Sequence, residues 1–149
     1  MYNSQDITVL IATKDRVKEI ERAIESTLNQ SIAANIVILD DASKVNIKDK
    51  LINKFEGKPI RWVRSELPSG VAGARNKLVK NSSGSLMVFL DDDAYFTQED
   101  SLEKIVNKFS TSNKIAGMAF KIILKEETDG LQIPFSKLTR YLNKDIENY

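Results

Sequence analysis

The amino-acid sequence predicts an α/β fold, in which an open and mostly parallel sheet is covered by helices on both faces. Short apolar runs rich in β-branched residues alternate with segments of helical, amphipathic spacing along the 149 residues. The runs are apolar at nearly every position, which is typical of parallel strands buried on both faces. Such strands need crossover connections, and right-handed crossovers place helices on both sides of the sheet. A chain of this length is expected to form one domain.

The first strand and the first helix carry the clearest pattern. Ile7–Ala12 consists only of apolar and β-branched residues, as expected of a buried strand. From Val17 the apolar residues follow the 3.6-residue period of a helix, while Lys18 and Glu21 lie on the opposite, charged face. The segment therefore predicts an amphipathic helix that covers the sheet.

The same alternation continues along the rest of the chain. Strands are predicted at Asn35–Leu39, Ile60–Val63, Leu86–Leu90 and Ile115–Leu124, and helices at Ile47–Phe55, Val71–Lys80 and Ser101–Phe109. A polar connector follows the last strand, and the spacing of Phe135, Leu138, Leu142 and Ile146 predicts one more amphipathic helix. We therefore divide the sequence into a domain over residues 1–125 and a connector with a helix over residues 126–149.

The composition excludes several classes of site and partner. Cysteine and histidine are both absent from the sequence, which excludes disulfides, Cys/His zinc sites and Ser-His-Asp triads. Any bound metal must therefore be a hard cation on oxygen ligands. Acidic and basic residues interleave and the net charge is +1, so no nucleic-acid-binding face is predicted. The sequence shows no signal peptide and no apolar run of the roughly 20 residues of a transmembrane segment, which favours a cytoplasmic location.

Three consecutive carboxylates, Asp91-Asp92-Asp93, follow the fourth predicted strand. Like charges about 4 Å apart repel by about 4 kcal/mol at an effective dielectric near 20, and a bound divalent cation would reverse that energy. If the segment continues as a strand, Asp91 and Asp93 point to one side and Asp92 to the other. The alternative is a solvated acidic turn leading into a helix that is N-capped by Asp100 or Ser101.

Other charged and small residues follow the remaining strands, and ligands of open α/β sheets bind beyond the carboxyl ends of strands. Asp40-Asp41 ends the second strand and is expected to add negative charge to the same edge. A cation between these carboxylates would let a nucleotide diphosphate bind there. Trp62 is interpreted as a core residue. The candidate phosphate ligands are Lys14, Arg16, Arg64 and Arg75, with the backbone N–H groups of Gly70–Ala74 at a helix start.

Four ordered motifs in this sequence resemble glycosyltransferase family 2. The motifs are Thr13-Lys14-Asp15-Arg16, Leu39-Asp40-Asp41-Ala42-Ser43, Gly70-Val71-Ala72-Gly73-Ala74-Arg75-Asn76 and Leu90-Asp91-Asp92-Asp93. The resemblance spans residues 6–125 and implies the GT-A fold, a Rossmann-like three-layer α/β/α sandwich. It also implies metal-dependent binding of a nucleoside-diphosphate sugar and inverting transfer of the sugar to a saccharide or lipid-linked acceptor, as in polysaccharide biosynthesis.

The resemblance further implies roles for individual residues. Thr13 would contact the nucleoside through its backbone, and Asp41 would accept a hydrogen bond from the base N3–H, which favours UDP- or dTDP-type donors. Asp92 would contact the ribose or nucleoside. Asp91 and Asp93 would form a D-x-D motif that binds Mn²⁺ or Mg²⁺. The other nucleotide-sugar-binding candidates are Asp15, Arg16, Gly70 and Arg75.

No residue is assigned as the catalytic base, because family members extend further along the chain to supply a carboxylate base and the acceptor site. The sequence therefore fits a fragment, a degenerate relative, or a donor-binding module completed by a second chain or a homo-oligomer, with a cytoplasmic or membrane-peripheral location. One alternative function is a receiver-like Mg²⁺-dependent phosphoacceptor, which needs a lysine after a late strand, such as Lys121 or Lys125. Another is a non-catalytic nucleotide-binding or assembly module.

Overall fold

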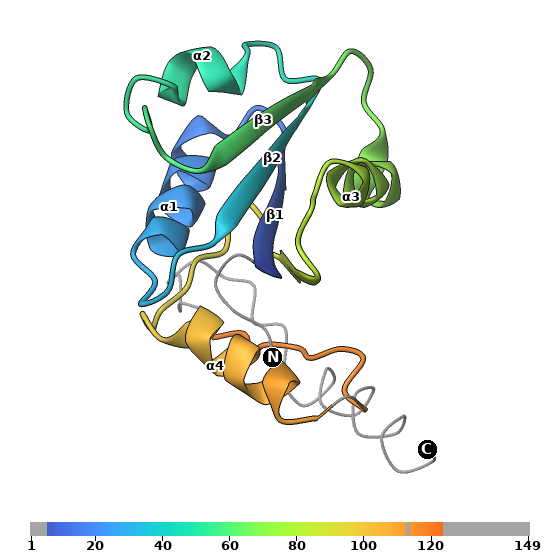
Figure 1. Ribbon diagram of the computed structural model, residues 1–149. Helices are drawn as coiled ribbons and strands as arrows, with labels where there is room; N and C mark the ends of the chain where they lie inside the picture. Colours follow the sequence, from blue (N-terminus) through green and yellow to red (C-terminus); the bar gives the residue numbers. More distant parts are fainter. Residues whose placement is uncertain (1–5, 113, 124–149) are drawn as a thin grey trace, which may run out of the picture. The chain divides into compact units, whose positions relative to one another are not determined.

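The computed structural model describes residues 6–112 and 114–123, in which one sheet of four parallel strands is flanked by helices (Figure 1). The strands are β1 (Ile7–Thr13), β2 (Asn35–Asp41), β3 (Ile60–Ser65) and β4 (Leu86–Phe89), in the order β3-β2-β1-β4. The helices are α1 (Val17–Leu28), α2 (Ile47–Leu51), α3 (Gly70–Lys80) and α4 (Ser101–Ser110). These elements lie in the first of two compact units, Met1–Ala116 and Gly117–Tyr149. The predicted α/β class and parallel sheet are confirmed.

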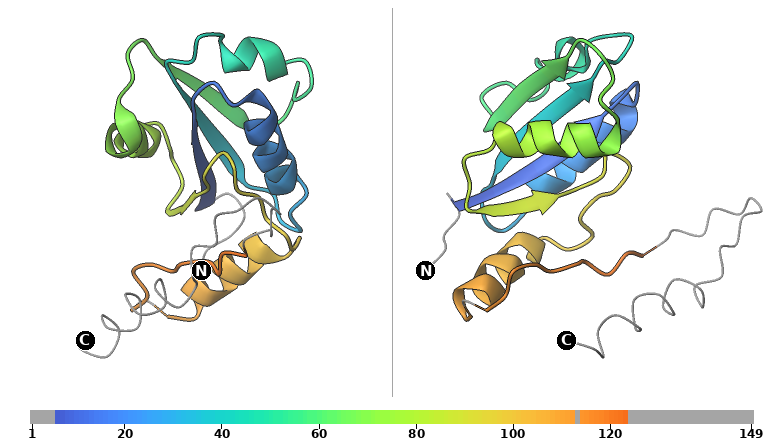
Figure 2. Two further views of the ribbon diagram at one scale, coloured as in Figure 1. Left: turned by 180° about the vertical axis from the view of Figure 1, so that it is seen from behind. Right: turned by 90° about the vertical axis from the view of Figure 1, so that its right-hand side faces the viewer.

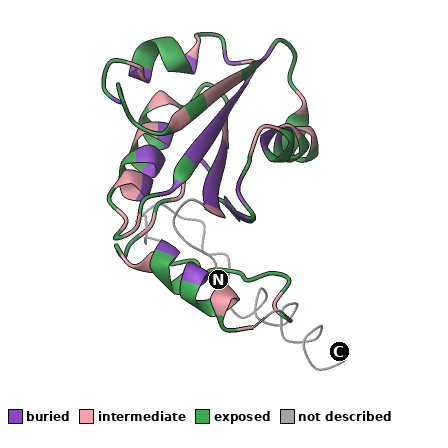
Figure 3. Ribbon diagram, viewed as in Figure 1, coloured by how far each residue is buried: buried purple, intermediate pink, exposed green. Residues whose placement is uncertain are grey.

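Helices cover both faces of the sheet, with α1 and α2 on one face and α3 on the other (Figures 1 and 2). β1 and β2 occupy the middle of the sheet and are buried along most of their length (Figure 3). Their side chains alternate between two cores. Ile11 and Ile38 pack in the core that contains α1, whereas Leu10 and Leu39 pack against Ala74 of α3. The alternation of a strand therefore decides which helix each residue faces.

The middle strands are longer than predicted, which matters for the site. β1 reaches Thr13 and β2 reaches Asp41, where the sequence alone predicts that both strands end with their last apolar residue. Thr13 is paired with Asp40, and Asp41 is paired with Ser65 of β3. The pairing between neighbouring strands therefore extends to these polar residues. The polar strand ends are thus held by backbone hydrogen bonds and do not form free loops.

Two other elements differ from the prediction. α2 ends at Leu51 and not at Phe55, and the chain continues as turns in which Lys54 N donates to the Leu51 carbonyl three residues back. The predicted strand Ile115–Leu124 is wrong for its described part, since residues 114–123 form no strand. An apolar, β-branched run forms a strand only where a neighbouring strand accepts its backbone hydrogen bonds, and its sequence does not reveal that neighbour.

The predicted helix around Phe135 and Ile146 lies outside the described residues. α4 agrees with its prediction, since Leu102, Ile105 and Val106 are buried against the core that contains α1. Among the residues that the structure describes, no helix is both long and apolar enough to cross a membrane.

Gly84 precedes β4 at a point where the chain passes close to β1. A Cβ atom at this position would lie 2.4 Å from Thr8 Oγ1 and 2.6 Å from the Asp6 carbonyl oxygen. Because Thr8 is buried within β1, the backbone would have to move to relieve this overlap. We expect Gly84→Ala to lower the free energy of unfolding by about 1–3 kcal/mol, measured by urea denaturation. Gly117→Ala, whose Cβ would meet nothing within 4 Å, is the control, and an equal loss in both variants would contradict the steric explanation.

Candidate functional site

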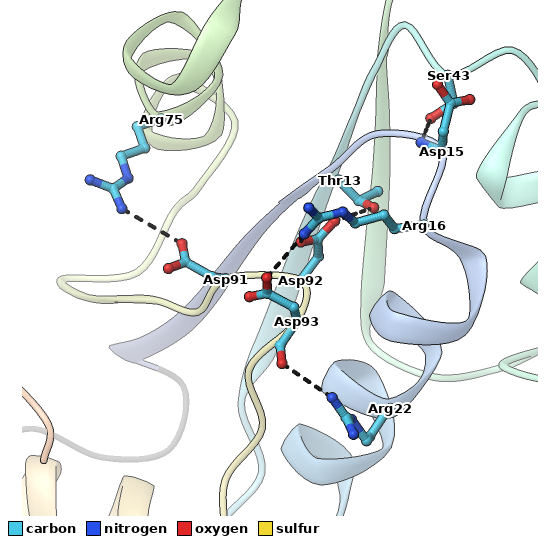
Figure 4. Close-up of polar contacts among 9 residues, drawn as sticks. All are labelled: Thr13, Asp15, Arg16, Arg22, Ser43, Arg75, Asp91, Asp92 and Asp93. Atoms are coloured by element: carbon cyan, nitrogen blue, oxygen red, sulfur yellow. Dashed lines mark hydrogen bonds and ion pairs between the residues drawn. The ribbon is translucent and has the colours of Figure 1, made fainter. Parts of the chain in front are cut away.

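The acidic triplet forms a turn at the carboxyl edge of the sheet. β4 ends at Phe89, Leu90 N donates to the Leu10 carbonyl at 3.1 Å, and Ala94 N donates to the Asp91 carbonyl at 3.0 Å. The prediction that strand alternation orients the triplet is therefore wrong. Asp92 and Asp93 instead share Arg16, which precedes α1, and Asp92 also binds Thr13 of β1, whereas Asp91 faces Arg75 of α3 (Figure 4).

Asp92 is the buried member of the triplet, with 8% of its surface exposed. Thr13 Oγ1 donates to Asp92 Oδ2 at 2.8 Å, and Arg16 Nη1 donates to Asp92 Oδ1 at 3.1 Å. Thr13 reaches this carboxylate because it is the last residue of β1 and is itself buried. The end of β1 and the turn after β4 are thus joined by a buried hydrogen bond.

Arg16 lies between two carboxylates of the triplet. Its Nη1 atom donates to Asp92 Oδ1 and also to Asp93 Oδ2, the latter at 3.0 Å (Figure 4). The negative charges of Asp92 and Asp93, with their hydrogen bonds, raise the pKa of Arg16 above its usual value. The Arg16 guanidinium therefore supplies positive charge between these two carboxylates, at the triplet where the sequence predicts a bound divalent cation.

Asp91 is directed to a different partner. Its side chain is 74% exposed and lies 3.6 Å from Arg75 Nη2 of α3. The structure therefore brings Asp92 and Asp93 together on Arg16, and pairs Asp91 with Arg75. Within residues 6–112 and 114–123, no group of three or more acidic side chains is close enough to hold a metal ion. A cation at this edge would have two carboxylates and would need oxygen atoms of a ligand or water as well.

Asp40 holds the start of α2 on one face of the sheet. It is 2% exposed and accepts hydrogen bonds from Ser43 N at 2.8 Å and from Ile47 N at 3.1 Å. Arg64 Nη1 forms an ion pair with the same carboxylate. Burial raises the pKa of Asp40, but these hydrogen bonds and the charge of Arg64 outweigh burial and hold the pKa below its usual value.

Asp41 faces the opposite side of the sheet and holds the start of α3. Ser69 N donates to its two oxygens at 3.0 and 2.9 Å, and Gly70 N donates to Oδ2 at 3.2 Å. Burial raises the pKa of Asp41. The hydrogen bonds from Ser69 and Gly70 and the charge of Lys77 lower the pKa by more than burial raises it, so the net shift is downward. Gly70 has a φ of +67°, a conformation that favours glycine.

These contacts change two expectations about charge. Asp40 and Asp41 do not simply add negative charge to the triplet, because the first pairs with Arg64 and the second caps α3. Arg64 was a candidate phosphate ligand, but its guanidinium contacts Asp40 and donates to the Ser43 carbonyl at 2.7 Å. Arg64 therefore stabilises the loop after β2 in this structure. Lys14, another candidate phosphate ligand, is exposed.

Asp15 ties the loop after β1 to the loop after β2. Its backbone N–H donates to Ser43 Oγ at 2.8 Å, and Lys44 N donates to Asp15 Oδ1 at 2.7 Å. Asp15 and Ala42 both have positive φ angles, of 57° and 62°. A left-handed conformation costs about 1–2 kcal/mol for most residues, and aspartate tolerates it better than most because its side chain bonds locally. The two loops that flank the site are therefore fixed to each other.

Two residues of α1, Arg22 and Ser26, and Gln30 just after its end hold the segment that runs from the triplet into α4, and the sequence predicts none of these contacts. Arg22 Nη2 donates to the Asp93 carbonyl at 3.2 Å, and Ser26 Oγ accepts from Phe96 N at 3.1 Å. Gln30 Oε1 accepts from Leu102 N at 3.0 Å, a capping contact that the Asp100 side chain does not make for α4. The three residues are spaced four positions apart, and this helical spacing of polar residues is the signal that could have identified them.

Trp62 lies in β3 and packs against the core that contains α1, which confirms the prediction that it is a core residue. The candidate positions that remain are Thr13 at the end of β1 with Asp15 and Arg16 after it, Asp41 at the end of β2, Gly70 at the start of α3, and Arg75 with the triplet. Together they form a charged edge at the carboxyl ends of β1, β2 and β4. Such an edge is where open α/β sheets bind their ligands.

Residues 8–149 match the model of the family described as Glycosyl transferase family 2. The uncharacterized glycosyltransferase YwdF of Bacillus subtilis (strain 168) is 29% identical over 143 residues, which are 95% of this chain and 52% of YwdF. The UDP-Glc:alpha-D-GlcNAc-diphosphoundecaprenol beta-1,3-glucosyltransferase WfaP of Escherichia coli is 33% identical over 91 residues, which are 60% of this chain and 36% of WfaP. The chain thus spans about half of YwdF and about a third of WfaP.

The fold is similar to that of a solved structure, the mannosyltransferase PcManGT from Pyrobaculum calidifontis in complex with GDP-Man and Mn²⁺. The TM-score is 0.66 at 21% identity, and the match covers 74% of this chain and 33% of PcManGT. This likeness concerns the fold, and it confirms the predicted GT-A architecture for the strands and helices described above.

Proposed function

Because the chain belongs to glycosyl transferase family 2, we propose that it binds a nucleoside-diphosphate sugar together with Mn²⁺ or Mg²⁺, as the donor-binding part of a transferase. The observation that supports this most directly is the position of Asp92 and Asp93, whose oxygens both accept a hydrogen bond from one guanidinium nitrogen. Two carboxylates that already share one positive group have the donor oxygens a hard divalent cation needs. PcManGT, which has a similar fold, was solved with GDP-Man and Mn²⁺.

The residues present fit a divalent cation with incomplete protein ligation. Mg²⁺ is usually held by one or two carboxylates plus substrate phosphates and water, which matches the pair formed by Asp92 and Asp93. We propose that Asp93 contacts the cation, together either with Asp92 or, in the arrangement that the D-x-D motif implies, with Asp91. A bound cation would neutralise the charge that develops on the departing nucleoside diphosphate.

The chain's own side chains would position the donor. We propose that Thr13 and Asp92 lie at the nucleoside, where their mutual hydrogen bond of 2.8 Å fixes the orientation of the Asp92 carboxylate. Arg16 and Arg75 would meet phosphate oxygens, since both guanidinium groups are about half exposed and lie beside the triplet. Asp15 would keep the loop after β1 in place through Ser43 and Lys44. Gly70 would set the start of α3, beside Asp41.

We propose an inverting transfer, and an acceptor that is a saccharide or a lipid-linked sugar. The name of WfaP gives a UDP-glucose donor and a diphosphoundecaprenol-linked acceptor, and supports this class of substrates. A receiver-like phosphoacceptor has weaker support. It needs a lysine after a late strand, whereas the described residues around Lys121 form no strand and Lys125 lies outside the described residues.

We expect UDP to bind the chain in the presence of Mn²⁺ and to lose most of its affinity in EDTA. Isothermal titration calorimetry measures both affinities, and binding that is independent of the cation would contradict the proposal. CDP is the comparator for the base, because cytosine N3 is an acceptor and cannot donate to Asp41. We expect CDP to bind about 10-fold more weakly than UDP, which corresponds to about 1.4 kcal/mol. Equal affinities would reject the contact between Asp41 and the base without affecting the cation result.

A further inference from the structure

Arg16 occupies the place that a cation between Asp92 and Asp93 would take. Its Nη1 atom lies 3.1 Å from Asp92 Oδ1 and 3.0 Å from Asp93 Oδ2. The other oxygen of Asp92 accepts the Thr13 hydroxyl, so Arg16 is bound to the Asp92 oxygen that Thr13 does not use (Figure 4). The guanidinium therefore uses one oxygen of each carboxylate.

A divalent cation and this guanidinium cannot occupy the same oxygens together. Both need lone pairs of Asp92 Oδ1 and Asp93 Oδ2, and two positive charges a few ångströms apart repel each other. Cation binding at these oxygens thus requires Arg16 to move. The Arg16 side chain is 51% exposed and that of Asp93 is 59% exposed, so solvent borders the contact and the side chain has room to turn away.

We propose that Arg16 is a resident counter-ion that makes the binding of the cation and of the nucleoside diphosphate interdependent. Without nucleotide it neutralises Asp92 and Asp93 and competes with the cation. When a diphosphate binds, its oxygens offer the guanidinium a bidentate partner, and the two carboxylates become free for the cation. Each ligand then raises the affinity for the other by the same factor. This inference rests on the proposed donor-binding function, and it makes Arg16 a positioning residue rather than a catalytic one.

The test compares Mn²⁺ binding to the full chain with and without UDP, measured by electron paramagnetic resonance of free Mn²⁺. We expect Arg16→Gln to bind Mn²⁺ alone about 10-fold more tightly than the unmodified chain, and UDP to enhance Mn²⁺ affinity about 10-fold less in this variant. Arg16→Lys keeps the positive charge and should keep the weak Mn²⁺ affinity. Lys18→Gln removes the same charge from an exposed position on α1 and should change Mn²⁺ affinity less than about twofold.

The outcomes separate this inference from the proposed function. Unchanged or weaker Mn²⁺ binding in Arg16→Gln overturns the counter-ion role, as does an equal gain in Lys18→Gln, which would reflect net charge alone. Absence of Mn²⁺ binding to every form also overturns it. If UDP fails to bind the unmodified chain with Mn²⁺, the donor function fails, while a gain in Mn²⁺ affinity without nucleotide still supports competition between Arg16 and the cation.

Discussion

Asp93→Ala is expected to reduce Mn²⁺-dependent UDP binding by at least about 100-fold while the fold stays intact. The carboxylate of Asp93 lies beside that of Asp92 on a shared positive group, so its loss removes one of the two oxygen sets proposed for the cation. The side chain is 59% exposed, and the contact from Arg22 is made to the backbone oxygen of Asp93. The substitution therefore removes a ligand without removing a core contact or the contact that holds the turn.

Calorimetry with UDP and Mn²⁺ measures the loss, and thermal melting followed by circular dichroism measures the fold. Glu99→Ala is the matched control, because it removes an exposed carboxylate from the loop that follows the triplet. Asp91→Ala distinguishes the two arrangements of the cation: a loss as large as that of Asp93→Ala supports the D-x-D motif, and a smaller one supports the pair of Asp92 and Asp93. Unchanged UDP affinity in Asp93→Ala, or a melting temperature lowered in step with affinity, would contradict the proposed role.

Local patterns in the sequence were sufficient for most of the fold. Ile7–Ala12 reads as a buried strand because every position is apolar or β-branched, and α1 begins and ends where its amphipathic period does. Burial on both faces and amphipathic spacing are properties of a short segment, so a single sequence reveals them. The position of the polar strand ends follows from the same reasoning, since parallel strands bring their carboxyl ends to one edge.

The partners of the charged residues were not predictable in the same way. Arg64 reads equally well as a phosphate ligand or as the partner of Asp40, and the choice depends on β3 lying beside β2 with Arg64 opposite Asp40. The triplet reads as a strand end, but the hydrogen bond from Ala94 N to the Asp91 carbonyl closes it as a turn. Thr13 and Asp92 are 79 residues apart, and no local pattern encodes such a contact.

Asp40 gives the clearest case of a charged residue that serves the fold while lying beside the site. The sequence places it with Asp41 as a pair, and strand alternation then sends the two side chains to different helices. Asp40, which is 2% exposed, accepts hydrogen bonds from Ser43 N in the loop after β2 and from Ile47 N at the start of α2, and it pairs with Arg64. Asp41 serves α3 from the other face. Of these two neighbouring acids, Asp40 supports the loop beside the site, and Asp41 lies where the nucleobase of the donor is proposed to bind.

Asp40→Ala is accordingly expected to lower the free energy of unfolding by about 3 kcal/mol and the melting temperature by about 10 °C. The backbone N–H groups of Ser43 and Ile47 lose their acceptor in a buried place, and Arg64 loses its partner. Arg64 is partly exposed, so water can solvate its guanidinium after Asp40 is removed. The expected loss of stability is therefore smaller than for a fully buried ion pair. Urea denaturation measures the change, with Glu56→Ala as an exposed control that should shift stability by less than about 0.5 kcal/mol.

The pH dependence of stability tests whether the charge of Asp40 is the cause. Its pKa in the folded chain is lowered, so the unfolded chain binds more protons at acidic pH, and stability rises with pH in that range. The contribution of Asp40 is therefore complete above the unfolded pKa of about 4 and is lost as the pH falls through the lower folded value. The stability difference between the unmodified chain and Asp40→Ala should be largest near neutral pH and shrink below about pH 4. A difference that stays constant down to pH 3 would assign the loss to packing and contradict the role of the buried carboxylate in holding α2.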